Sequence, residues 1–270
     1  MRSIPVSLIA LCLFAASLDG QIRKPFGIDA RQSLLALMLE VERGFGHVII
    51  ERVWEPGGPS FGSYEIDANA IPTITLAKDD LTEANLAHEL MHLKLILQGY
   101  PRIEWRVSDS RFTTQEIANE LHELLATIRD PIEHFIFHAT IAAMGIMPDP
   151  EDVGVLTRYV YDKSRPKEGS GGSISMFFSL TLSVQDSALR RQLLASYERK
   201  GLRAEALAGK AMALQVRRMH PKTPKDEVDC FIACLNIYWA GKRTATLLSQ
   251  SSERRGNIAR KVATLMVKFY

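Results

Sequence analysis

The feature that most constrains this chain is the pentapeptide His88-Glu89-Leu90-Met91-His92, which lies in a stretch with helical periodicity. Positions four apart lie one above the other on a helix, so His88 and His92 can present two imidazoles to one ion. Neutral imidazole is a good zinc ligand, and a catalytic zinc site adds a third protein ligand and keeps one position for water. Glu89 would be the general base that takes a proton from that water. The alternative is a helix whose histidines are solvated or satisfied in the core.

The flanking residues set the expected limits of this helix. Apolar residues recur between residues 80 and 98, which supplies enough apolar surface for a buried helix. Asp80 and Glu83 form a capping-box pattern at the start, and Gly99 followed by Pro101 predicts the end.

A third ligand is expected from the next helix, which the apolar pattern places between residues 113 and 129. This helix carries Glu116, Glu120 and Glu123. On a helical wheel Glu120 flanks the apolar stripe most closely, so Glu120 is the first choice for the third zinc ligand and Glu116 the second. A carboxylate that does not bind the metal could accept a hydrogen bond from a ligand histidine. The alternative for each residue is a solvated glutamate.

A further helix is expected to open at Asp130, where a capping residue, a following proline and Glu133 combine into a start signal. His134 and His138 lie four apart on this helix. They could form another metal pair, or place one imidazole where it stabilises an oxyanion. Residues 135–137 between them are strongly apolar, which favours histidines in the core or at the edge of a cleft.

Upstream of the HExxH helix, the patterns predict a helix at residues 29–43 and strands at 47–54, 61–66 and 71–77. We expect these strands to form an antiparallel meander that leads directly into the metal-binding helix. The last strand alternates polar and apolar residues, so a free edge there could bind a peptide by strand addition. The alternative is a central strand with no free edge.

This order of a helix, three strands, the HExxH helix and a glutamate-bearing helix resembles the zincin metallopeptidases, and within them the gluzincin branch. The chain looks most similar to the small gluzincin-like domains of anti-repressor and radiation-response regulator proteases, over roughly residues 29 to 145. The resemblance implies that His88, His92 and a glutamate bind zinc, that Glu89 is the base, and that the strand at 71–77 holds the substrate.

The match to the gluzincin pattern is incomplete at the third ligand. The pair Asn119-Glu120 resembles the thermolysin-like ligand segment, in which an aspartate follows the glutamate by four positions, but Leu124 stands there in this chain. Glu116 does have an acidic residue four positions on, so both glutamates remain candidates. The third histidine of the extended metzincin motif is absent after His92.

At 270 residues and 46% hydrophobic composition, the chain can bury one sizeable core. We expect an α+β fold, with a small antiparallel sheet and zincin-like active-site helices in residues 21–150 and a mainly α-helical region in residues 151–270. Residues 1–20 resemble a secretory signal peptide. A genuine signal would make the protein secreted or periplasmic, and otherwise we expect a cytoplasmic protein. No other stretch approaches the length of a membrane span.

The charge is uneven along the chain. The formal net charge is +2, but from Asp186 onward 17 Lys and Arg stand against 7 Asp and Glu, which leaves +10 there and −8 before it. Such a basic third could meet nucleic acid or an anionic membrane, but no nucleic-acid motif accompanies it, so a solvated helical surface is expected. Cys230 and Cys234, four apart in a helical pattern, are expected to be small core residues.

Two functions follow from these patterns. The first is a zinc-dependent metallopeptidase that hydrolyses a peptide or protein substrate, with Glu89 as general base. The alternative is a non-catalytic, metal-bearing binding or regulatory protein that acts through its basic helical C-terminal third. A helical protein without metal is a third interpretation. The substrate and the oligomeric state do not follow from the sequence.

Overall fold

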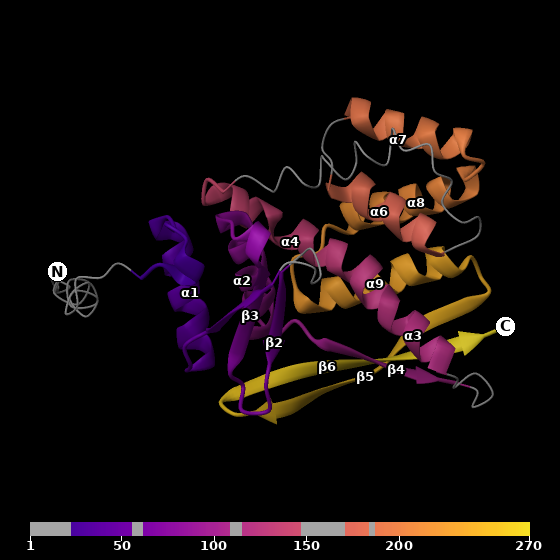
Figure 1. Ribbon diagram of the computed structural model, residues 1–270. Helices are drawn as coiled ribbons and strands as arrows, with labels where there is room; N and C mark the ends of the chain where they lie inside the picture. The colour runs from indigo at the N-terminus through magenta and orange to yellow at the C-terminus, as the bar shows by residue number, and fades with distance from the viewer. Residues whose placement is uncertain (1–22, 56–61, 109–114, 147–170, 184–186) are drawn as a thin grey trace, which may run out of the picture.

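The computed structural model describes residues 23–55, 62–108, 115–146, 171–183 and 187–270, and the expected signal peptide lies outside these residues. The α+β class is confirmed (Figure 1). The helices are α1 (Gln32–Phe45), α2 (Glu83–Leu97), α3 (Gln115–Leu124), α4 (Asp130–Ala143), α6 (Gly171–Ser183), α7 (Ser187–Arg199), α8 (Arg203–Met219) and α9 (Pro224–Trp239), with short turns η2 (Pro25–Gly27), η3 (Lys78–Asp80) and η5 (Leu125–Arg129). The strands are β1 (Ile50–Trp54), β2 (Ser63–Ile66), β3 (Pro72–Ala77), β4 (Arg102–Val107), β5 (Arg243–Arg255) and β6 (Ile258–Phe269). None of the described helices is long and apolar enough to cross a membrane.

The first sheet has the order β1-β3-β2, with β1 parallel and β2 antiparallel to β3, so the expected meander is wrong. The reason lies in β3, whose residues from Pro72 to Leu76 are all buried, including Thr73 and Thr75. A strand buried along its length takes the central position, where both edges are paired. The expected peptide-binding edge at residues 71–77 therefore does not exist, and the outer strand on the antiparallel side is β2.

The HExxH sequence forms α2 as expected, but the helix starts slightly later than predicted. Thr82 caps it, with its hydroxyl accepting from the Asn85 backbone N–H at 3.1 Å, while Asp80 belongs to the preceding turn η3. Glu83 binds Arg31 at the start of α1 instead of closing a capping box. The predicted end is confirmed, since α2 stops at Leu97 and Gly99 has a φ of 87°. The helix packs with α1 and the sheet around one apolar cluster.

The next two predicted helices are one continuous helical segment, α3-η5-α4, in place of a fresh start at Asp130. The segment η5 is a π-turn, in which the Asp130 N–H donates to the carbonyl of Leu125, five residues back. Pro131 explains the wide turn, because proline has no N–H to donate and its ring would clash with the carbonyl four residues earlier. One extra residue in the turn rotates the rest of the helix by about 100° relative to a regular α-helix.

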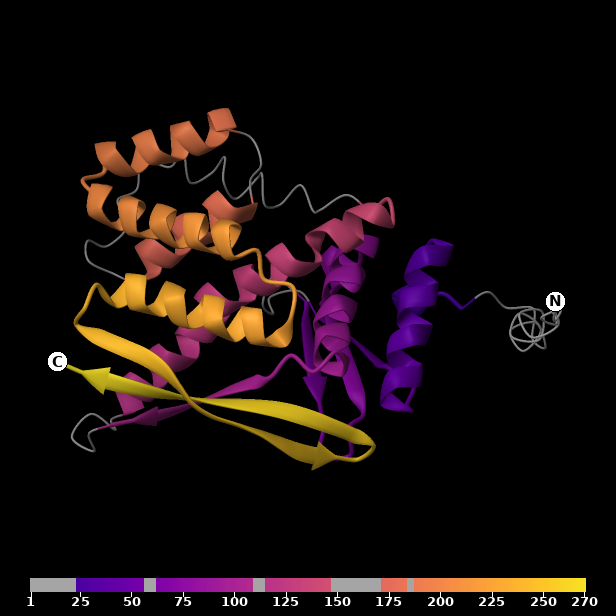
Figure 2. The same cartoon turned by 180° about the vertical axis from the view of Figure 1, so that it is seen from behind.

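The C-terminal region differs most from expectation. Helices α7 to α9 occur where helices were predicted and α6 is an additional one, but the last segment is a long hairpin, β5–β6, and not a helix. Its strand β6 also pairs in parallel with β4, from the N-terminal half, to give the sheet order β4-β6-β5 (Figure 2). A two-stranded hairpin is marginal alone, and the third strand together with helix packing stabilises it.

The packing crosses the expected boundary at residue 150. One apolar cluster joins Ile103 of β4 and Ile128 of η5 to Phe231 of α9 and Leu265 of β6. Cys230 and Cys234 are buried there as free thiols, as predicted. The two halves therefore share one core, which brings the C-terminal helices close to the residues of α4.

Candidate metal centre

The two histidines of α2 are positioned as one pair of metal ligands. Nε2 of His88 lies 3.2 Å from Nε2 of His92. Two nitrogens on a tetrahedral zinc ion, each about 2.0–2.1 Å from the metal, lie roughly 3.3–3.4 Å apart. His92 is only 4% exposed and His88 is half-buried, so both rings are held by packing, with Phe137 of α4 edge-on to each.

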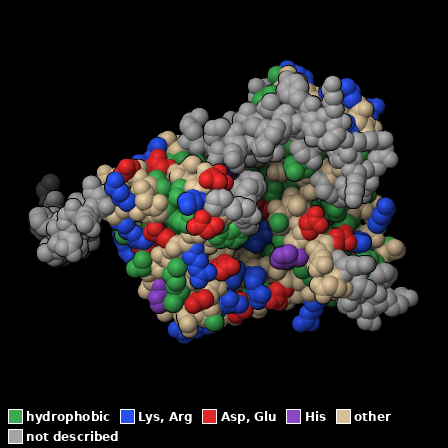
Figure 3. Space-filling view, in the orientation of Figure 1, with side chains coloured by type: hydrophobic (Ala, Val, Ile, Leu, Met, Phe, Trp, Pro, Cys, Tyr) green, Lys and Arg blue, Asp and Glu red, His purple; other side chains and the backbone are tan. Residues whose placement is uncertain are grey.

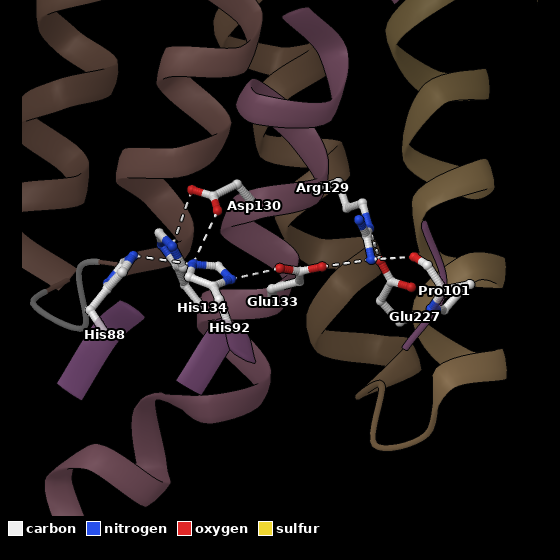
Figure 4. Close-up of polar contacts among 8 residues, drawn as sticks. All are labelled: His88, His92, Pro101, Arg129, Asp130, Glu133, His134 and Glu227. Carbon is white, nitrogen blue, oxygen red and sulfur yellow. Dashed lines mark hydrogen bonds and ion pairs between the residues drawn. The ribbon is translucent and has the colours of Figure 1, made fainter. Parts of the chain in front are cut away.

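The first turn of α4 brings a carboxylate and a third imidazole to the same place. Asp130 Oδ1 lies 3.4 Å from His92 Nε2, and Asp130 Oδ2 lies 3.1 Å from His134 Nε2. Nitrogens of His88, His92 and His134 all lie within 4.8 Å of one another. Three imidazoles from two helices therefore meet here, and Asp130 contacts His92 and His134, as the close-up shows (Figure 4).

A chain of buried charges holds the other side of His92. Its Nδ1 lies 2.8 Å from Glu133 Oε2, and the second oxygen of Glu133 binds Arg129 at 2.7 Å. Arg129 donates in turn to Glu227 of α9 at 2.6 Å and to the Pro101 carbonyl at 2.8 Å (Figure 4). A carboxylate on Nδ1 orients the ring so that Nε2 faces the metal position, which is the arrangement found around zinc-binding histidines. The C-terminal region thus contributes to the centre through Glu227.

Glu89 lies buried beside the histidines and under the start of β2. It is 5% exposed, and burial raises the pKa of its carboxyl to about 7 in the metal-free protein. Gly62 faces it closely, since a Cβ built on Gly62 would lie 2.6 Å from Glu89 Oε1. A carboxylate with a pKa near neutrality is suited to exchange protons with water at physiological pH.

The histidines differ in their readiness to bind a proton. Burial, together with the neighbouring His134 and His92, holds the pKa of His88 well below its usual range. Burial also disfavours a charge on His92, but the hydrogen bond that His92 donates to Glu133 and the charge of Asp130 outweigh it and raise the pKa of His92 to about 9. Desolvation of Asp130 is likewise outweighed by the imidazoles, chiefly His134, so the pKa of its carboxyl is lowered.

An aromatic ring from β2 covers the centre. Tyr64 stacks on His92, with ring centroids 5.3 Å apart and the planes inclined by 21°. Burial raises the pKa of the Tyr64 phenol, so it stays protonated as a hydrogen-bond donor. Tyr64 also lines a cavity of about 420 Å³ together with Arg52, Thr73 and Arg260. It is therefore the residue that connects this cavity to the histidines.

The structure does not bring Glu120 to the histidines. Glu120 precedes Asp130 by ten residues on one continuous helix, so the two lie about 15 Å apart along the axis. Its carboxylate binds Arg243 of β5 at 2.6 Å. Glu116 lies a further turn away from the centre on the same helix, and its side chain is outside what the structure describes. Among the described residues, the carboxylate beside His92 Nε2 is Asp130.

The sequence did contain a signal for these residues. Asp130, Glu133 and His134 lie at i, i+3 and i+4, so they share one helix face, just as His88 and His92 do. Asp130 and Glu133 also fit a helix-capping pattern, so the presence of these two acids could be explained without a metal site. His134 was a candidate for a metal or oxyanion role, and the structure places it at the centre. His138 stacks on His134 one turn farther on.

This donor set suits zinc. Imidazole nitrogen and a single carboxylate are common zinc ligands, and the Glu133 hydrogen bond supplies the outer support that such ligands need. No protein-family model matches the chain, and its comparison with curated proteins and with solved structures gives no match either. The functional argument therefore depends on the geometry of the centre itself.

Proposed function

We propose that this protein is a zinc-dependent peptidase whose ion is held by His88, His92 and Asp130, with Glu89 as general base. The observation that carries the proposal is the position of Asp130, whose carboxylate lies 3.4 Å from Nε2 of His92 while Glu133 binds Nδ1 of the same ring. Nε2 of His88 lies 3.2 Å from the same His92 nitrogen, so His92 lies between the other two proposed ligands. A three-ligand site of this kind keeps one position for water.

The surrounding residues have defined tasks in hydrolysis. A bound zinc ion would supply a Lewis acid that polarises the scissile carbonyl and acidifies a water molecule. Glu89 accepts a proton as the water oxygen bonds to the carbonyl carbon, and passes that proton to the amine nitrogen as the carbon–nitrogen bond breaks. His134 and Tyr64 lie beside the metal ligands, where N–H or O–H donors can stabilise negative charge on the carbonyl oxygen.

The test measures zinc content and hydrolysis on the same purified variants. We expect one zinc per chain in the wild type, lost in His88→Ala and Asp130→Ala and retained in Glu120→Gln. Glu89→Gln should keep zinc but lose hydrolysis of a mixed fluorogenic peptide library. Retention of zinc by Asp130→Ala would remove Asp130 from the ligand set. Full hydrolysis by Glu89→Gln would overturn the catalytic assignment.

A metal-bearing regulatory protein is the second candidate, because a ligand atom of His134 also lies within 4.8 Å of those of His88 and His92. If His134 binds the ion along with His88, His92 and Asp130, a tetrahedral zinc has no position for water, as in structural zinc sites. The low exposure of His92 and Glu89 agrees with a closed site. His134→Ala separates the two candidates: the peptidase keeps stoichiometric zinc at unchanged affinity, whereas the closed site loses affinity.

A further inference from the structure

Helices α6, α7 and α8 enclose a cavity of about 260 Å³ that shares no lining residue with the metal centre. The three helices stack at the end of the molecule opposite the hairpin (Figure 1). The cavity has an apolar floor, formed by the buried Phe177 and Ala213, and an apolar wall formed by Leu194 and Leu214. Leu214 is 56% exposed although it lines the cavity.

The rim of this cavity carries charge of one sign. Four cationic side chains line it, and no carboxylate of the described residues does: Arg190, Arg191, Lys210 and Arg217. In the described part of the chain, neither Arg191 nor Lys210 forms an ion pair. Burial and the charge of Arg190 lower the pKa of Arg217, whose guanidinium donates to the Thr181 carbonyl. The cavity therefore concentrates positive charge around an apolar floor.

An unsatisfied polar atom lies in the same wall. Thr181 is 8% exposed, and its Oγ1 has no hydrogen-bond partner among the described residues. A buried hydroxyl without a partner costs free energy, and a bound water or ligand group that accepts its hydrogen bond would remove that cost. The wall thus offers one hydroxyl beside the cationic rim.

We propose that this cavity binds a small amphiphilic carboxylate, with its hydrocarbon chain on the apolar floor and its carboxylate among the cationic side chains. Lys and Arg form charge-assisted hydrogen bonds with carboxylates, and apolar lining with a few convergent polar groups is typical of small-molecule sites. A nucleic acid is a poor fit, because the one aromatic ring in the lining is the buried Phe177 and exposed rings for base stacking are needed. The proposal does not depend on the peptidase assignment.

The charges along the chain favour the same ligand class. Lys and Arg alternate with Asp and Glu over the lower part of the face that Figure 3 shows, so this part of the surface presents no broad basic patch. The cavity rim brings four cationic side chains together, of which Arg191 and Lys210 form no ion pair with the described residues. Local charge of this kind selects an anion at one site, in contrast to the extended surface that a membrane or a polyanion needs.

Isothermal titration of the full-length protein with decanoate tests the proposal, with decan-1-ol as the uncharged ligand. We expect saturable, one-to-one binding of decanoate and clearly weaker binding of the alcohol. Leu214→Asp places an acid at the mouth of the cavity and should weaken decanoate binding about tenfold or more, because an unpaired like charge opposes the carboxylate. Lys210→Gln should weaken it about two- to fivefold, the usual effect of an exposed charge pair.

Leu207→Asp is the matched control, since Leu207 is 49% exposed on the same helix but does not line the cavity. Its decanoate affinity should equal that of the wild type. Three results would overturn the proposal: no saturable binding of decanoate, equal affinity for the alcohol and the carboxylate, or equal loss in Leu207→Asp and Leu214→Asp. Zinc content should stay unchanged in all of these variants, which keeps this test separate from that of the metal centre.

Discussion

The buried charge chain behind His92 allows a sharp stability prediction for Arg129→Met. The Arg129 side chain is 16% exposed and lies between Glu133, at 7%, and Glu227, at 0%. Removing the guanidinium leaves two buried carboxylates without their shared partner. Breaking a buried ion pair by removing one partner costs about 3–5 kcal/mol. We expect a loss in this range and not twice as large, because each acid has a way to reduce the penalty.

The two acids reduce the penalty differently. Burial, partly offset by Arg129, already raises the pKa of Glu227 to about 7, so without Arg129 it can take up a proton near neutral pH. Glu133 keeps the imidazolium of His92 as a partner in the metal-free protein. The double variant Arg129→Met/Glu227→Gln removes one orphaned charge, so it should recover about 1 kcal/mol or more of the loss, as coupled neighbours do.

Urea unfolding of the metal-free protein at pH 7.5 measures these losses. Lys94→Met is the matched control, since Lys94 pairs with Glu40, whose side chain is 57% exposed and stays hydrated when left alone. It should lose about 1 kcal/mol or less. If Arg129→Met loses no more than Lys94→Met, the charge chain does not support the centre energetically and the reasoning fails.

Acidification gives the same experiment an independent check. Arg129 and the hydrogen bond to His92 outweigh burial and lower the pKa of Glu133 in the folded protein. A lowered carboxyl pKa contributes stability that is present above the unfolded value of about 4.3 and is lost as pH falls through the folded value. Arg129→Met lacks much of this contribution, so the stability difference from the wild type should shrink below about pH 4.3.

Three further outcomes are expected at the metal centre. Glu133→Gln should weaken zinc binding about 10- to 100-fold, as loss of a ligand-orienting carboxylate typically does, and unchanged affinity in a competition assay with a chelator would contradict its role. Zinc binding should strengthen about tenfold per pH unit from pH 7 toward 9, and it should release close to one proton at pH 7. The reason is that the pKa of His92 in the metal-free protein is about 9, whereas the metal needs the neutral ring. A zinc affinity that does not change with pH would refute this. Gly62→Ala should impair hydrolysis while zinc is retained, because the added methyl would lie 2.6 Å from Glu89 Oε1. Full activity would show that the backbone at residue 62 moves to make room for the methyl group.

The helix that carries the HExxH motif could be predicted from the sequence because the residues that determine it lie close together in the chain. Helical periodicity, a Gly stop and two histidines four apart all act within a few turns, so α2 and the proposed ligand pair His88 and His92 follow from neighbouring residues alone. The same holds for the helices between residues 187 and 239. Side chains four residues apart on a helix lie on the same face, so sequence spacing determines which of them meet.

Which segments form strands and how these strands pair depends on contacts between residues far apart in the chain, and no local sequence pattern records such contacts. The segment 102–107 became a strand because β6, some 160 positions later, pairs with it, and the end of the chain became a hairpin for the same reason. The central place of β3 likewise depends on which surfaces the rest of the chain covers. Strand propensity depends strongly on such context, so tertiary pairing overrides a local preference for helix.

The proposed third ligand shows the same contrast between local and long-range information. The wheel argument correctly placed glutamates on a helix face, but it could not say how far along that helix the HExxH histidines would lie. The tertiary packing of α2 against α4 put Asp130, and not Glu120, beside His92, and the π-turn at Pro131 turned Asp130, Glu133 and His134 together. The motif therefore identified the pair of histidines, whereas the long-range packing selected the carboxylate, because only packing sets the distance between residues on different helices.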